Sequence, residues 1–197
     1  MIKLVFLSIG LVIFFSCGVK ESSSGDVFFE KGEYQEAISV YTNYLATHPN
    51  DENTLYKRGR SLEELGKYQE AQKDFDRLIE LDPNNINAHL SLAKLFYNTN
   101  NYNQVLVYSS KAIKLNENSA QAHFLSARGA HQLGYTDRAL ESYNNAITIN
   151  KDFGEAFLYR GALKIGLNQT RSACEDFNFA RSLNVEGAND ALSTYCK

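Results

Sequence analysis

The sequence predicts an all-α protein, a solenoid of about five helix-turn-helix repeats that ends in a capping helix. The first observation is internal repetition with a period of 34 residues. The segment from Gly66 to Pro83, GKYQEAQKDFDRLIELDP, restates the segment from Gly32 to Pro49, GEYQEAISVYTNYLATHP. The second is that apolar residues recur at helical spacing before and after the glycine of such a unit. The third is that the 197 residues contain only two prolines, and proline interrupts helices.

The first 16 residues have the composition of a signal peptide. One cation, Lys3, precedes an apolar run from Leu4 to Phe15, which is shorter than the roughly 20 residues that span a bilayer as a helix. Cys17 closes the run, and polar residues follow at once. This arrangement resembles a bacterial lipoprotein signal, in which the cysteine is acylated and becomes the first residue of the mature chain. We therefore expect a signal peptide at 1–16, lipidation of Cys17 and a short tether at 17–25; the alternatives are an uncleaved anchor and an ordinary secretory signal.

Equivalent positions of the repeats carry residues of similar size. Small residues form an unbroken column at Gly25, Gly59, Ala93, Ala127 and Gly161. Aromatic residues form a second column at Tyr41, Phe75, Tyr143 and Phe177, to which Ser109 is the exception. The small residue lets two helix backbones approach closely, and the aromatic ring fills the space beside them. Glycine or asparagine, which tolerate a left-handed backbone, stands at the turn between the two helices.

Five units follow one another in register, at residues 18–51, 52–85, 86–119, 120–153 and 154–187. One helical hairpin cannot bury its own apolar face, whereas a stack of hairpins can. The serine-rich start of the first unit favours a cap over a helix interior, so we expect its first helix to begin near Ser24 or Asp26. In residues 188–197, helical spacing of apolar residues predicts a single capping helix over the last unit.

The small, aromatic, alanine and proline positions fall at the offsets of the tetratricopeptide repeat, which the chain resembles from residue 18 to residue 187. The resemblance implies a right-handed α-solenoid in which the first helix of each repeat lines a concave groove for a protein or peptide partner. The lysine and asparagine pattern with which some members of the family hold a C-terminal carboxylate is missing here, so that specificity is not expected.

Little in the sequence suggests catalysis. There is no glycine-rich phosphate loop, no metal-type cysteine pair and no nucleophile–base pair, so we expect no enzyme activity, no cofactor and no small-molecule substrate. A net charge of −3 gives no reason to expect a nucleic-acid partner. His89 and His123 lie one period apart, but both occupy a helix-packing position of the repeat, so we expect packing rather than a metal site.

Two rows of residues on the first helices are candidates for partner binding. The basic row is Arg60, Lys94 and Arg128, and the apolar row, four residues earlier in the repeat, is Tyr56, Leu90, Phe124 and Leu158. Residues four apart share a helix face, so the rows should run side by side along the groove. In the alternative, Arg60 simply pairs with Glu63 and Glu64, whereas Lys94 and Arg128 have no acid three or four residues on. Since neither Phe124 nor Lys94 belongs to the packing columns, Phe124→Ala and Lys94→Glu should leave the fold intact.

Two cysteines remain if Cys17 is lipidated. Cys174 and Cys196 each lie eleven residues from Val185, where the last helical hairpin should turn, so the two should face each other. In an oxidising compartment we expect them to form a disulfide; the alternative is two buried thiols.

These observations predict an adaptor rather than an enzyme. We expect a lipid-tethered scaffold that faces the periplasm or the cell surface and holds a protein or peptide partner in its groove. The alternative is an accessory or regulatory subunit of an envelope enzyme or assembly machine. Lipoproteins of outer-membrane protein assembly and of pilus assembly share this outline.

Overall fold

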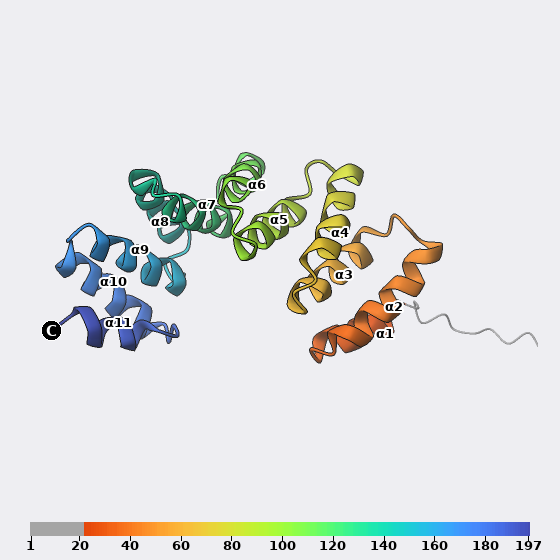
Figure 1. Cartoon of the computed structure of the whole chain (residues 1–197), viewed down its shortest axis with the longest axis horizontal. Helices are drawn as coiled ribbons and strands as arrows, with labels where there is room; N and C mark the ends of the chain where they lie inside the picture. Colours follow the sequence, from red (N-terminus) through yellow and green to blue (C-terminus); the bar gives the residue numbers. More distant parts are fainter. Residues whose placement is uncertain (1–21) are drawn as a thin grey trace, which may run out of the picture.

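The computed structural model describes residues 22–197, so the expected signal peptide, Cys17 and the start of the tether lie outside the described range. Within that range the chain forms eleven helices and no strands, arranged as an arched stack (Figure 1). In chain order the helices are α1 (Ser22–Glu30), α2 (Tyr34–Thr47), α3 (Glu52–Glu64), α4 (Tyr68–Leu81), α5 (Ile86–Asn98), α6 (Tyr102–Leu115), α7 (Ala120–Gln132), α8 (Thr136–Ile149), α9 (Gly154–Gly166), α10 (Thr170–Ser182) and α11 (Ala188–Tyr195). The predicted all-α solenoid is therefore confirmed. None of these helices is long and apolar enough to cross a membrane.

The contacts inside each hairpin are those that the two columns predict. A Cβ atom built on Gly59 would lie 2.6 Å from a ring carbon of Phe75, and the same holds for Gly25 with Tyr41 and for Gly161 with Phe177. These rings are almost completely buried. Any side chain larger than hydrogen at these glycines would displace the ring that fills the hairpin.

Local signals set where most helices begin and end. Left-handed backbone occurs at the turns inside the hairpins, at Gly32, Gly66, Asn100, Gly134 and Asn168. The side chains of Asp51, Asn85 and Ser119 accept a hydrogen bond from the first turn of α3, α5 and α7. At the equivalent position before α9 stands Phe153, which makes no such cap. Helix α1 begins at Ser22, two residues before the earliest expected start, in keeping with the preference of serine for the first positions of a helix.

Two hairpins, the second and the fifth, are held by the same buried ion pair. Arg58 donates two hydrogen bonds to Asp74, at 2.9 and 2.6 Å, and Arg160 does the same to Asp176. Each arginine also reaches back to the preceding hairpin, to Thr42 or Asn144. A bidentate arginine–carboxylate pair fixes orientation as well as distance, so it sets how one hairpin stacks on the next.

The C-terminal helix is tied to the last hairpin. A disulfide joins Cys174 in α10 to Cys196 just after α11, with the two Cα atoms 5.7 Å apart. The ring of Tyr195 lies near that of Phe177, and Ala188 at the start of α11 is fully buried. Helix α11 thereby covers the apolar face that the last hairpin would otherwise expose, as expected of a capping helix.

Candidate partner-binding groove

The concave face of the arch is lined by the first helices of the hairpins. The backbone of each first helix lies close to that of the next, from α1 through α3, α5, α7 and α9 to α11, whereas the backbones of no two second helices among residues 22–197 come as close. Elements on the inside of a curved stack lie closer together than those on the outside. The residues of both rows therefore lie on the helices that form the inner surface.

The N-terminal part of this surface carries a cluster of paired charges, which we call the Glu63 cluster. The Glu63 side chain is only 2% exposed and lies 3.2 Å from Arg60 and 3.0 Å from Lys94. Glu64 adds contacts at 3.5 Å to Arg60 and 3.8 Å to Lys94. Arg60 thus pairs with Glu63 and Glu64 of its own helix, which is the alternative given in the sequence analysis. The acids that meet Lys94 come from the preceding repeat, which spacing along one helix could not reveal.

The C-terminal part has an aromatic environment in place of carboxylates. The guanidinium carbon of Arg128 lies 4.0 Å from the ring centroids of both Tyr97 and Tyr159, an arrangement that we call the Arg128 stack. Arg128 also donates a hydrogen bond to the Tyr97 hydroxyl. No carboxylate of residues 22–197 forms an ion pair with Arg128. Its charge is held by ring faces, so the edge of the guanidinium keeps donors for a further partner.

The apolar row divides between core and surface. Tyr56, Leu90 and Leu158 are half-buried, whereas Phe124 is only 7% exposed. The Phe124 ring centroid lies 4.7 Å from that of Phe153 and 5.8 Å from that of Tyr159. The expectation that Phe124 lies outside the helix packing is therefore wrong, because Phe153, the residue before α9, covers its ring. Phe124 is part of the core beneath the concave surface and offers little surface of its own to a partner.

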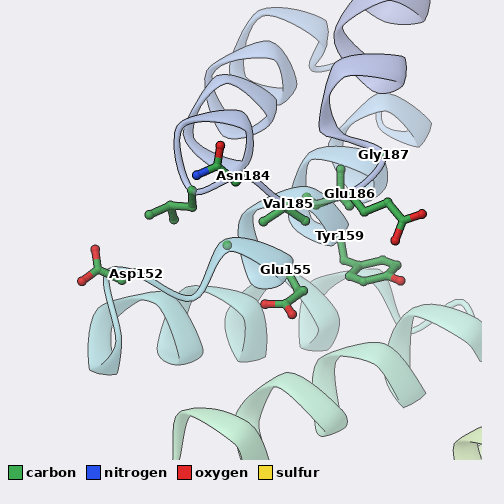
Figure 2. Close-up of a pocket in the computed structure, with 10 residues that line it drawn as sticks. Asp152, Glu155, Tyr159, Asn184, Val185, Glu186 and Gly187 are labelled. Carbon is green, nitrogen blue, oxygen red and sulfur yellow. The ribbon is translucent and has the colours of Figure 1, made fainter.

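A pocket of about 560 Å³ closes the C-terminal end of this face, between the start of α9 and the loop from α10 to α11 (Figure 2). Leu158 of the apolar row and Tyr159 of the Arg128 stack both line it. The pocket therefore continues the groove rather than forming a separate site.

Both histidines of the sequence analysis bind backbone. His89 Nε2 lies 2.9 Å from the carbonyl oxygen of Pro83, and His123 Nε2 lies 3.0 Å from that of Glu117. A carbonyl oxygen only accepts, so Nε2 carries the proton and donates in both cases. No group of three potential metal ligands occurs within the described part of the chain.

Four residues of these clusters are missing from the predicted rows: Glu63, Glu64, Tyr97 and Tyr159. Glu63 and Tyr97 are themselves one period apart, and His131 continues their column. This third column, three residues after the basic row, could have identified Glu63 and Tyr97 from the sequence as neighbours of the basic residues. Tyr159 belongs to no such column, and its contact with Arg128 is evident only from the way α9 packs against α7.

Comparisons with known proteins agree with this architecture. Models of the tetratricopeptide repeat match residues 22–53 and 53–85, and a model of anaphase-promoting complex, cyclosome, subunit 3 matches residues 73–146. No curated protein sequence matches the chain.

Three solved structures illustrate the similarity. MamA has a TM-score of 0.72 at 25% identity, over 81% of this chain and 94% of MamA. YrrB, a tetratricopeptide-repeat protein with an unusual peptide-binding site, has a TM-score of 0.69 at 19% identity, over 89% and 90%. PilW, a type IV pilus biogenesis factor, has a TM-score of 0.75 at 16% identity, over 83% and 76%. The chain is a tetratricopeptide-repeat protein, and this fold is typically a non-catalytic module for protein interaction.

Proposed function

We propose that this protein is a non-enzymatic scaffold of the cell envelope that binds a segment of a partner protein along its concave face. The observation that carries the proposal is the Arg128 stack, which presents two tyrosine rings and a cation without a carboxylate of its own on the inner surface. Arg60 and Lys94 are already neutralised by Glu63 and Glu64. Arg128 is therefore the member of the basic row that is best placed to meet an acidic group of a partner.

Affinity should come mainly from the exposed parts of the apolar row and from the tyrosines. Large, rigid aromatic side chains and arginine dominate binding energy at protein interfaces, and charge at a rim mainly guides encounter. Leu90, Leu158, Tyr97 and Tyr159 are all half-buried, so each keeps surface for a partner. An extended or helical segment with apolar side chains beside an acidic one fits this chemistry.

Site-specific photocrosslinking in cells tests the groove. A photoreactive phenylalanine analogue at Leu90 should give a crosslinked partner, and the same analogue at Glu141, exposed on second helix α8, should not. Adding Arg128→Gln to the protein that carries the analogue at Leu90 should weaken the crosslink while the circular dichroism stays that of the parent. Equal crosslinking at Glu141, or none at Leu90, would place the partner elsewhere and contradict the proposal.

Envelope tethering depends on Cys17. Replacement by alanine should block lipidation, so the chain should no longer partition with membranes and should change in electrophoretic mobility. Fractionation of cells that produce each form measures both effects. Membrane association with unchanged mobility in Cys17→Ala would show that the lipid anchor is wrong.

The second candidate, an accessory subunit of an envelope assembly machine, uses the same groove. PilW shares the fold and is a pilus biogenesis factor. The identity of the crosslinked protein distinguishes the two: a structural component or enzyme of one machine would favour the accessory role.

A further inference from the structure

The pocket at the C-terminal end of the groove has a charge opposite to that of the Arg128 stack beside it. Three carboxylates line it, from Asp152, Glu155 and Glu186, and no lysine, arginine or histidine does (Figure 2). We propose that this pocket receives a lysine or arginine side chain of the partner segment, next to an apolar residue that contacts Leu158 and Val185. This inference rests on the proposed function and adds the chemistry and orientation of the bound segment.

The carboxylates are available for a ligand. All three residues are exposed, and none forms an ion pair with a base among residues 22–197. Glu63 and Glu64, by contrast, already meet Arg60 and Lys94. The negative charge at the pocket therefore has no basic partner within the described chain.

Helix dipoles oppose a cation here but do not outweigh the carboxylates. The N-termini of α9, at Gly154, and of α11, beside Gly187, both lie at the pocket. Each helix N-terminus is equivalent to about half a positive charge, so together they offset about one of the three negative charges. A net charge of about −2 remains, and it favours a cation.

The pocket is preformed by close packing. A Cβ atom on Gly154 would lie 2.3 Å from a methyl carbon of Val185, so the absence of a side chain lets the α10–α11 loop lie directly on the start of α9. The far end of α11 is fixed by the Cys174–Cys196 disulfide. Because the α10–α11 loop is already in place, binding need not order it, which lowers the entropic cost of binding. The volume of about 560 Å³ lies within the usual range for ligand sites.

Tyr159 links the pocket to the rest of the groove. Its ring already lies 4.0 Å from one guanidinium, that of Arg128, and the same residue lines the pocket beside Glu186 (Figure 2). A partner cation in the pocket would therefore meet both carboxylate and aromatic surface, the two environments that stabilise a guanidinium. A bare divalent ion fits less well, because no group of three acidic or other ligands in the described chain lies close enough to hold one.

A small probe tests the pocket without the partner. The full-length protein in non-ionic detergent, labelled with nitrogen-15, is titrated with N-acetyl-leucyl-arginine amide to millimolar concentration. The matched control is the citrulline peptide, which has nearly the same shape and no charge. The arginine peptide should shift the amide signals of Glu155, Val185 and Gly187, and the citrulline peptide should bind at least about tenfold more weakly, as expected for loss of a charge-assisted contact.

A pair of charge-matched variants separates the pocket from general attraction. Glu155→Gln with Glu186→Gln should abolish the shifts, whereas Asp137→Asn with Glu141→Gln on exposed α8 removes the same charge and should bind as the parent does. No shifts at the pocket, equal binding of the citrulline peptide, or equal loss in both double variants would overturn the proposal. If crosslinking from Leu90 succeeds while these shifts fail, the groove stands and the pocket is wrong; if the shifts appear and Leu90 gives no crosslink, the proposed function is wrong and the pocket stands.

Discussion

The two halves of the concave face treat equivalent cations differently. Arg60 and Lys94 meet the carboxylate of Glu63, whereas Arg128 lies between the rings of Tyr97 and Tyr159. The residues that decide this, Glu63 and Tyr97, occupy the same position of successive repeats. The three cations of this column therefore do not form a uniform basic strip. In the N-terminal half, Glu63 neutralises Arg60 and Lys94, whereas the C-terminal half keeps the charge of Arg128 beside an acidic pocket.

The largest expected difference between the halves concerns the apolar row. Phe124→Ala should lower the free energy of unfolding by about 3–5 kcal/mol, because it removes a buried ring between Tyr143, Phe153 and Tyr159. Tyr56→Ala, at the equivalent half-buried position, should cost less. Urea denaturation followed by circular dichroism measures both, and equal losses would show that Phe124 supports the groove no more than Tyr56 does.

The C-terminal end of the stack differs from the N-terminal end because a disulfide, Cys174–Cys196, ties its last helix to the preceding hairpin. Cys174→Ser with Cys196→Ser should lower stability by about 3 kcal/mol, since the bond closes a loop of about 22 residues. In hydrogen exchange, the loss of protection should concentrate in α10 and α11 and leave α1 and α2 unchanged. Mass spectrometry of the non-reduced protein is the control: two freely alkylated thiols would contradict the bond.

Salt should distinguish the Glu63 cluster from the Arg128 stack. Glu63→Gln leaves Arg60 and Lys94 together without their shared counter-charge, which should cost about 2 kcal/mol at low ionic strength and less at about 1 M salt, where screening is strong. Arg128→Gln should cost about 1 kcal/mol with little salt dependence, because ring contacts rather than ion pairs are lost. The measurement is thermal unfolding at two salt concentrations. The same salt dependence in both variants would remove the distinction between the halves.

The smallest expected effect is a dependence of stability on pH that arises from His131 in the C-terminal half. Burial, and then the positive charge of Arg128, lower the pKa of His131 below its usual value of about 6.5. Below that pH the unfolded chain binds the proton more readily than the folded chain, so this contribution to stability is present above about pH 6.5 and is lost as the pH falls. His131→Gln should therefore flatten the fall in melting temperature between about pH 7 and pH 5.5, and Arg128→Gln should reduce it in part. An unchanged profile in His131→Gln would assign the fall to other groups.

The position of Phe124 shows where reasoning from single columns failed. It shares its repeat position with Tyr56 and Leu90, and nothing in that column sets it apart. The difference comes from the position before the next first helix, α9, where Phe153 stands in place of the polar caps Asp51, Asn85 and Ser119 and packs on Phe124. Comparing the cap positions as a fourth column would have flagged the exception. The pairing of Arg128 with Tyr159 had no such signal.

The sequence by itself determined the helices, the turns and the contacts inside each hairpin. A glycine opposite an aromatic ring, as in Gly59 and Phe75, joins residues 16 apart in one hairpin, so the 34-residue period repeats that contact with the helices that make it. Contacts between repeats depend also on the rotation from one hairpin to the next, which no single repeat encodes. Only the tertiary structure therefore decided that Glu63 lies beside Lys94 and that Tyr159 covers Arg128. It also decided that the loop between α10 and α11 closes an acidic pocket at the end of the groove.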